Sequence, residues 1–162
     1  MAEEHHRHLL KLPIGAIKQK VVARPQVPCS STELAEMLQD LHKAVKNKEY
    51  VRAKSTPDNP ALSDDYIFTT EDECFILKDL WEENFVGKVL DVGKGAAKRK
   101  KQGLPQEYLY VFQYPCRLRR KDVEESGIES EDVLIYIKIN NRKVPYQKVI
   151  VISFHKNREK SA

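Results

Sequence analysis

The sequence predicts an α+β fold in which two N-terminal helices pack on a small antiparallel β-sheet. Apolar residues recur at helical spacing in two segments of the first half, 30–47 and 70–85. Three segments rich in β-branched and aromatic residues follow at 107–114, 133–139 and 148–155. Because the helices precede the strands instead of alternating with them, we expect the helices to cover one sheet face and the other face to meet a ligand.

The length of 162 residues and the 41% hydrophobic content suffice for one domain with a core and are too small for two. Residues 1–29 contain four prolines or glycines and only a short apolar stretch, Val21 and Val22. We therefore predict an N-terminal arm over 1–29, a single domain over 30–158 and a short tail over 159–162.

Each predicted helix begins with a capping-box pattern. Residues 30–33 read Ser-Ser-Thr-Glu, and residues 70–73, Thr-Glu-Asp-Glu, repeat the pattern before the second apolar stripe. Trp81 falls in that stripe, so we expect it in the core. The polar composition of 50–67 and the glycines that open 93–106 predict loops.

Side-chain alternation brings polar groups together on the last two predicted strands, which nine residues join and which we expect to form an antiparallel hairpin. Tyr136 and Lys138 share one face of the first strand. In the second strand, one face is expected to carry Val149, Val151, Ser153 and His155. If the register brings the two polar faces together, a phenol, an amine and an imidazole converge.

The charge distribution is compatible with a polyanionic ligand. The chain has 28 Lys and Arg against 24 Asp and Glu, a formal net charge of +4. Acidic residues concentrate at 64–73 and 122–132, away from the basic segments, which predicts separate surfaces for an RNA backbone and for a protein partner. The clustered basic residues are Lys94, Lys98, Arg99, Lys100, Lys101, Arg117, Arg119, Arg120 and Lys121.

Several classes of protein are not expected. The three cysteines are an odd number without a Cys-x-x-Cys pair, and the cluster of His5, His6 and His8 lacks the fixed geometry of a metal site, so neither a metal nor a cofactor is predicted. Neither a signal peptide nor a membrane-spanning apolar run is present, which predicts a cytoplasmic protein with no membrane partner. No Walker, GxSxG or HExxH motif is found.

The groups on the strands suit RNA cleavage by the internal 2′-hydroxyl. That reaction needs a base, an acid and cations that stabilise the charge on the phosphorus centre. A histidine titrates near neutrality and can serve in either proton-transfer role, and a lysine supplies a point charge. We therefore consider His155, Tyr136 and Lys156 as site candidates, with Lys138 nearby.

The same strands resemble the MqsR (motility quorum-sensing regulator) toxin family, part of the RelE-like ribonucleases. The resemblance rests on IYIKI at 135–139 and VIVISFHKN at 149–157, with further similarity in LWEENFVGK at 80–88, YVFQYP at 110–115 and QDLHKAVKNKEYVRAK at 39–54. It implies a RelE-like fold and a metal-independent endoribonuclease (mRNA interferase), the toxin of a type II toxin–antitoxin system. Its partners would be mRNA and a cognate antitoxin protein.

The resemblance also implies site residues. The family's strand tyrosine corresponds to Tyr136, its basic residue after Ser-Phe to His155, its lysine after the helix-end aromatic to Lys88, and its strand glutamine to Gln113. We expect Lys88 and Lys156 to stabilise phosphate charge. Salt-sensitive RNA binding is predicted for Lys98, Arg99, Lys100, Lys101, Arg117, Arg119, Arg120, Lys138 and Arg158.

Two alternatives remain open at the level of the sequence. The first is a non-catalytic RNA-binding module, in which Tyr108, Tyr110 and Tyr114 stack on bases. The second is a protein-interaction domain that captures its partner through a strand edge or the N-terminal arm.

Overall fold

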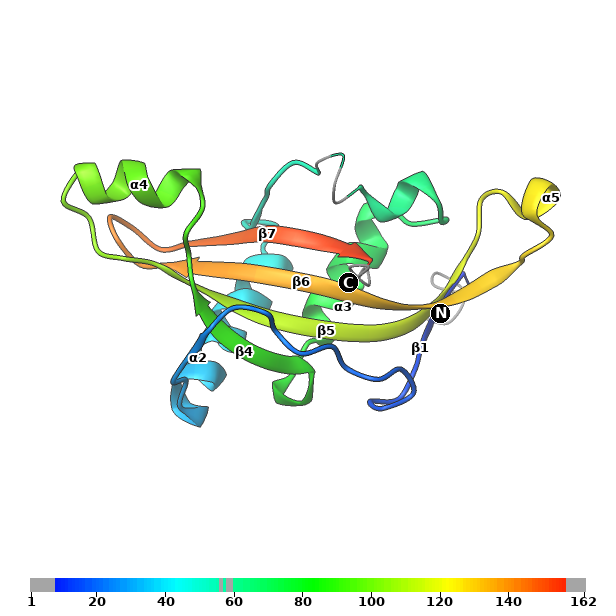
Figure 1. Cartoon of the computed structure of the whole chain (residues 1–162), viewed down its shortest axis with the longest axis horizontal. Helices are drawn as coiled ribbons and strands as arrows, with labels where there is room; N and C mark the ends of the chain where they lie inside the picture. The colour runs from blue at the N-terminus through cyan, green and yellow to red at the C-terminus, as the bar shows by residue number, and fades with distance from the viewer. Residues whose placement is uncertain (1–7, 56, 58–59, 157–162) are drawn as a thin grey trace.

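The structure, a computed structural model, describes residues 8–55, 57 and 60–156 (Figure 1). Its centre is a seven-stranded sheet in the order β2-β4-β5-β6-β7-β3, with β1 paired to part of β5. The strands are β1 (Leu9–Lys11), β2 (Gln26–Val27), β3 (Val51–Arg52), β4 (Phe85–Leu90), β5 (Tyr108–Arg119), β6 (Ser130–Arg142) and β7 (Lys148–Lys156). The helices are α2 (Ser31–Lys46), α3 (Thr70–Asp79), α4 (Lys94–Lys101) and α5 (Val123–Ser126), with 3₁₀ turns at Leu62–Asp64 and Glu82–Asn84.

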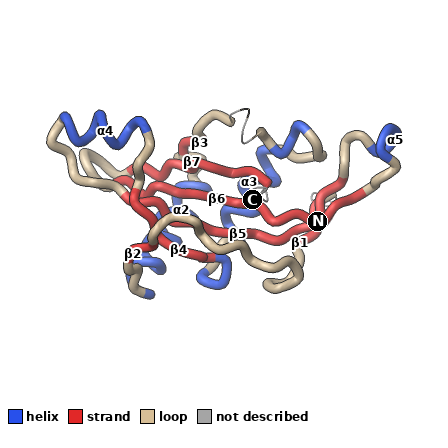
Figure 2. Tube along the Cα trace, viewed as in Figure 1, coloured by secondary structure: helices blue, strands red, loops and turns tan. Residues whose placement is uncertain are grey.

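The mixed α/β class and the mostly antiparallel sheet agree with the sequence-based expectation. Only β3 and β7 are parallel among the named strand pairs. The sheet is larger than the small one predicted, and the helices are placed differently, because short strands precede and separate them and α4 and α5 were not expected (Figure 2).

Helices α2 and α3 cover one face of the sheet, which we call the helix face. The side chain of Ser30 accepts a hydrogen bond from the backbone amide of Glu33 at 3.1 Å, which caps α2 as predicted. Burial of each large apolar side chain contributes about 1.5–3 kcal/mol, so this layer is the main source of stability. Residues buried in it include Met37, Leu38, Leu41, Ile76, Leu77, Phe112, Tyr114, Ile135, Ile137 and Ile139.

The second helix starts one residue earlier and ends sooner than predicted. Thr69, not Thr70, is its cap, and it forms a reciprocal capping box with Asp72. Because the helix ends at Asp79, the helical spacing no longer applies beyond it. Trp81 is therefore 53% exposed, against our expectation of a core position, and Phe85 begins strand β4.

The N-terminal arm is built into the sheet. β1 pairs with β5 and β2 pairs with β4, both antiparallel. Between these strands the arm crosses the sheet on the side opposite α2 and α3, as Figure 1 shows for the blue segment. Leu9, Leu12 and Val22 are buried. We call the side of the sheet that this segment crosses the arm face.

A β-bulge in β7 corrects the predicted alternation of its side chains. Lys138 pairs with Ser153, but Ile139 pairs with Val151, which leaves Ile152 as an extra residue. One extra residue reverses the alternation beyond it. Val151 therefore lies on the helix face, whereas Ser153 and His155 lie on the arm face instead of sharing a face with it.

We expect Asp72→Ala to lower the free energy of unfolding by about 2–3 kcal/mol, because the buried carboxylate caps α3 and its charge-assisted hydrogen bonds are lost together. Asp72 Oδ2 accepts hydrogen bonds from Thr69 N at 2.8 Å and Thr69 Oγ1 at 3.0 Å, and it lies 2.6 Å from His8 Nε2. Glu71→Ala is the matched control, since this exposed acid occupies the same helical turn and should cost less than about 1 kcal/mol. Equal losses in urea denaturation would contradict the assignment.

Candidate functional site

Three polar residues form a row across the central strands. Gln113 pairs with Tyr136, and Tyr136 pairs with His155. Directly paired residues on neighbouring strands have their side chains on the same sheet face, and here that is the arm face. The rings of Tyr136 and His155 are in contact, with their centroids 5.6 Å apart.

Lys138 lies beside this row, because it is two residues after Tyr136 on β6 and therefore shares its sheet face. Its Nζ lies 5.3 Å from the centroid of the Tyr136 ring. A phenol, an imidazole and an amine therefore lie together, as the expected hairpin register required. We call Tyr136, Lys138 and His155 the polar patch.

The contacts of His155 define its tautomer. Nδ1 lies 3.0 Å from the backbone carbonyl oxygen of Lys156. Because a carbonyl only accepts hydrogen bonds, Nδ1 carries the proton, and in the neutral ring Nε2 then holds the basic lone pair. The imidazole is partly exposed. It is thus suited to accept a proton at Nε2.

Tyr136 holds its proton at neutral pH. Burial raises the pKa of its phenol above the ordinary value, and the positive charge of Arg24 partly offsets this. A protonated phenol that remains partly exposed can donate a hydrogen bond to a ligand.

Gln113 lies in the row but is covered by the arm. Its side chain is 1% exposed, with Oε1 accepting from Lys20 N at 3.0 Å and Nε2 donating to Lys20 O at 2.8 Å. Both polar atoms of the amide are thereby bound to the backbone of the arm. The observed role of Gln113 is to anchor the arm, and its side chain does not join the exposed surface of the polar patch.

Lys88 and Lys156 lie on the helix face, away from the polar patch. Lys88 Nζ is 2.5 Å from Glu33 Oε2, on α2, and 4.7 Å from the centroid of the Tyr108 ring. Lys156 Nζ is 2.6 Å from Glu131 Oε2. The expectation that these lysines act beside His155 does not fit this geometry, because strand alternation directs them to the opposite side.

The basic segment after β4 forms helix α4 instead of the predicted loop. Arg99 is buried and fastens this helix to the sheet: its Nε lies 3.0 Å from Glu107 Oε1, and its Nη2 donates to Val144 O at 3.2 Å. Its role is structural, which contradicts the RNA-binding role predicted for it from the sequence. Lys98, Lys100 and Lys101 are exposed and remain candidates.

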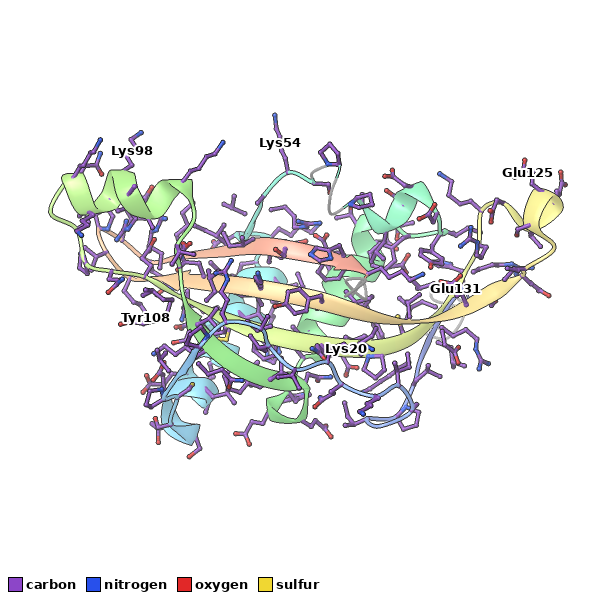
Figure 3. All side chains as sticks on the ribbon, viewed as in Figure 1. Lys20, Lys54, Lys98, Tyr108, Glu125 and Glu131 are labelled. Atoms are coloured by element: carbon purple, nitrogen blue, oxygen red, sulfur yellow. The ribbon has the colours of Figure 1, made fainter. Side chains whose placement is uncertain are left out.

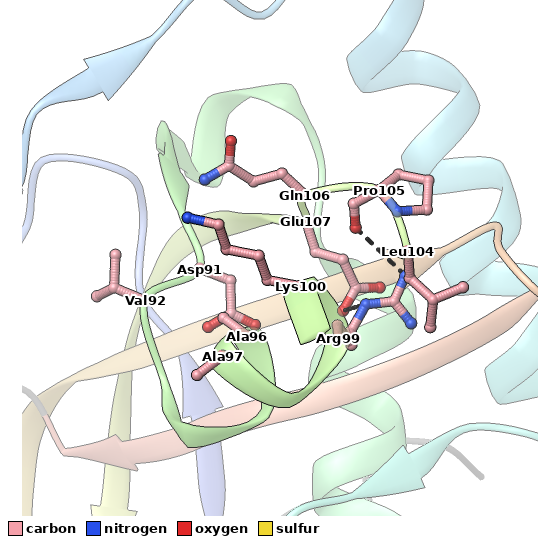
Figure 4. A pocket seen from close by; sticks show the side chains of 10 residues that line it. All are labelled: Asp91, Val92, Ala96, Ala97, Arg99, Lys100, Leu104, Pro105, Gln106 and Glu107. Carbon is pink, nitrogen blue, oxygen red and sulfur yellow. Dashed lines mark hydrogen bonds and ion pairs between the residues drawn. The ribbon is translucent and has the colours of Figure 1, made fainter. Parts of the chain in front are cut away.

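A pocket of about 340 Å³ lies beneath α4 (Figure 4). Figure 4 shows the Arg99 and Glu107 side chains meeting at its wall. Glu107 also accepts two hydrogen bonds from Arg142, at 2.8 and 3.0 Å. The residues that line the pocket are Asp91, Val92, Ala96, Ala97, Arg99, Lys100, Leu104, Pro105, Gln106 and Glu107.

The second predicted basic cluster lies far from the first. Figure 3 shows Lys98 at one end of the molecule and Glu125, on α5, at the other. At the α5 end the arginines are paired with acidic residues. The N···O distances are 2.7 Å for Arg117–Asp132, 3.1 Å for Arg119–Glu129, 2.7 Å for Arg120–Asp122 and 3.2 Å for Arg120–Glu131. The two clusters therefore do not form one continuous RNA surface, and Arg158 lies outside the described residues.

The aromatic strand does not present a stacking surface. Tyr114 is buried on the helix face and donates to Asp79 at 2.7 Å, and Tyr110 donates to Glu33 at 2.7 Å. Tyr108 lies on that same face, next to Lys88. Tyr110 and Tyr114 are thus bonded to residues of the helix layer, and Tyr108 is half-buried on the same sheet face.

Among the described residues, no cluster of three or more His, Cys, Asp or Glu side chains could hold a metal ion. His8 contacts Asp72, while His5 and His6 lie outside the described part of the chain. In that described part, none of the helices has the length and apolar character to cross a bilayer.

Comparison with family models, curated proteins and solved structures yields no match for this chain. The similarity to MqsR toxins therefore stays a prediction made from the sequence motifs.

No pattern in the sequence places the N-terminal arm at the candidate site, yet the arm reaches it. Lys20 is bound to Gln113, and Arg24 lies near enough to influence Tyr136. The paired strand in this part of the arm is only two residues long, Gln26–Val27. So short a strand leaves no periodic signal in the sequence.

We expect Gln113→Leu to loosen the arm, because Leu has a similar volume but cannot hold the backbone N–H and C=O of Lys20. Hydrogen exchange of the amides around Lys20 should accelerate about tenfold, as loss of roughly 1.4 kcal/mol of local stability implies. Gln106→Leu, at an exposed position, serves as the control. Unchanged exchange in Gln113→Leu would show that other contacts hold the arm.

Proposed function

We propose that this protein is an endoribonuclease that cleaves single-stranded mRNA without a metal ion and acts as the toxin of a type II toxin–antitoxin pair. The observation that carries the proposal is the contact between Tyr136 and His155 on the arm face, 5.6 Å between ring centroids, with Lys138 beside them. These three groups supply the proton acceptor, the proton donor and the positive charge that RNA cleavage requires.

The proposed reaction is an internal transfer. His155 Nε2 takes the proton from a ribose 2′-hydroxyl, whose oxygen attacks the adjacent phosphorus. The bond from phosphorus to the 5′-oxygen breaks, and the Tyr136 hydroxyl gives its proton to that leaving oxygen. The products are a 2′,3′-cyclic phosphate and a free 5′-hydroxyl. The charged imidazole and the phenolate then return to their starting states by proton exchange through solvent.

The tautomer of His155 supports this assignment of roles. Its Nδ1 donates to the carbonyl of Lys156, which orients the ring, and we assign the role of the base to Nε2. Tyr136 carries the proton that the leaving oxygen needs, because burial raises the pKa of its phenol and the group stays protonated at neutral pH. Lys138 lies next to Tyr136 and would attract the phosphate.

The alternatives have less support. A non-catalytic binding module needs exposed aromatic platforms, but Tyr110 and Tyr114 donate their hydroxyl protons to Glu33 and Asp79 within the helix layer. A protein-interaction role is compatible with the toxin proposal, because the cognate antitoxin would be such a partner.

We expect His155→Ala and Tyr136→Phe each to reduce cleavage of a long unstructured RNA in EDTA by about 10²–10⁴-fold, the usual contribution of a positioned proton-transfer group. Lys156→Ala is the matched control, since it is the next residue on β7 but faces the other side, and it should retain cleavage. Primer extension of the products measures the rate and maps the sites.

Cleavage that survives both His155→Ala and Tyr136→Phe would overturn the catalytic assignment. Cleavage abolished by EDTA would overturn metal independence. Salt-sensitive binding without cleavage by the wild type would favour a binding module, and neither cleavage nor binding would favour a protein-interaction domain.

We expect the α4 lysines to contribute to the salt dependence of RNA binding. Simultaneous replacement of Lys98, Lys100 and Lys101 by Ala should reduce the slope of log K against log salt by up to about 2, at roughly 0.7 per single-strand phosphate contact. The control is Arg117→Ala with Arg119→Ala, which removes cations already paired with Asp132 and Glu129. A larger slope change in the control would place the RNA path at the α5 end instead.

A further inference from the structure

We infer that Arg24, on the N-terminal arm, binds a phosphate of the RNA beside the polar patch, so that the arm forms one wall of the substrate site. This inference rests on the proposed function and deepens it, because it assigns a phosphodiester-binding residue from a segment without a role in the sequence-based site.

The arm is held at points on both sides of Arg24. Before it, the backbone of Lys20 makes two hydrogen bonds to Gln113, which is the direct neighbour of Tyr136 in the sheet. After it, Gln26 pairs with Val89. The segment between these anchors must cross the arm face next to β4 and β5.

A small apolar cluster fixes the course of the arm between the anchors. Val22 is buried against residues of β4 and β5, and the ring of Tyr136 packs on the edge of the same cluster. Val22, two residues before Arg24, therefore belongs to the apolar cluster on which Tyr136 packs. The β4 and β5 members of this cluster are Val89, Leu109 and Val111.

Arg24 is exposed, and its guanidinium is loosely held by the protein at the end of β4. Nη1 donates to Leu90 O at 3.3 Å, a long hydrogen bond. Among the described residues, Arg24 makes only this one hydrogen bond. A guanidinium has five N–H donors, so most of its hydrogen-bonding capacity is left for a ligand. The positive charge of Arg24 acts on the Tyr136 phenol: burial raises the pKa of Tyr136, and Arg24 partly offsets that increase.

Arg24 supplies what the other cations cannot. Lys88 and Lys156 are ion-paired on the helix face, so they are not available to a phosphate on the arm face. A guanidinium binds two phosphate oxygens at once through parallel N–H donors, whereas the lysine of the patch, Lys138, is a single point charge. Arg24 thus adds to Lys138 a second positive charge that acts on Tyr136.

The competing explanation is structural: Arg24 only ties the arm to the end of β4 through Leu90. The two roles differ in what they predict. A phosphate-binding residue changes the salt dependence of nucleic-acid binding and leaves the arm in place. If Arg24 only ties the arm to β4, its replacement speeds hydrogen exchange of the arm amides and leaves the salt dependence of nucleic-acid binding unaltered.

The test compares Arg24→Ala with Lys18→Ala in the full chain, because Lys18 is an exposed cation on the same arm and its replacement changes the net charge equally. Cleavage is measured on RNA in EDTA, and binding on a 2′-O-methyl oligonucleotide of the same sequence, which cannot be cut by its own 2′-oxygen. We expect Arg24→Ala to lower kcat/KM about 10–100-fold and to reduce the salt slope by about 0.7. Lys18→Ala should match the wild type, and Arg24→Lys should recover part of the loss.

The outcomes separate this inference from the proposed function. Cleavage by the wild type, with Arg24→Ala equal to Lys18→Ala in rate and slope, overturns the role of Arg24 and leaves the nuclease assignment intact. If the wild type does not cleave, the oligonucleotide still decides: a smaller slope in Arg24→Ala supports the phosphate contact, and an unchanged slope overturns it. Faster hydrogen exchange around Lys20 with an unchanged slope establishes the structural tie instead.

Discussion

The arrangement of the molecule depends on the register of β5, β6 and β7. Because Gln113, Tyr136 and His155 are direct neighbours in that register, they share one sheet face. The bulge at Ile152 is essential to this, since an unbroken β7 with the pairing of Val151 to Ile139 would turn His155 toward the helices. A single extra residue thus brings the imidazole to Tyr136. The same bulge lets Val151 contribute to the core while Ser153 remains on the opposite side.

The two faces of the sheet serve different purposes. The helix face holds most buried apolar side chains, and ion pairs close its edges, such as those of Lys88 with Glu33 and Lys156 with Glu131. The arm face has a much smaller apolar cluster and is covered only in part, by the arm crossing over Gln113. A surface that carries polar groups on rigid strands and remains partly open is the kind on which a substrate can be held in a defined position.

Electrostatics sort the basic residues into structural and accessible ones. The arginines at the α5 end are paired with Asp122, Glu129, Glu131 and Asp132, so much of their charge is already offset. Arg99 is likewise committed to Glu107, and this contact presents the lysines of α4 to solvent. The charge left for a polyanion therefore lies on α4 and along the arm face. A count of basic residues along the chain could not have made this distinction, since it depends on cross-strand pairing.

The sequence by itself determined the first helix with its Ser30 cap, the three long strands and their hairpin, because capping and side-chain periodicity are local properties. It also determined that Tyr136 and Lys138 share a face, which follows from a period of two. Only the tertiary structure decided the side on which His155 lies, the placement of Lys88 and Lys156 in the helix layer, and the exposure of Trp81. It alone also decided that the arm joins the sheet. These features depend on a bulge, on where a helix ends and on pairing between segments far apart in the chain, and no local pattern of residues encodes such contacts.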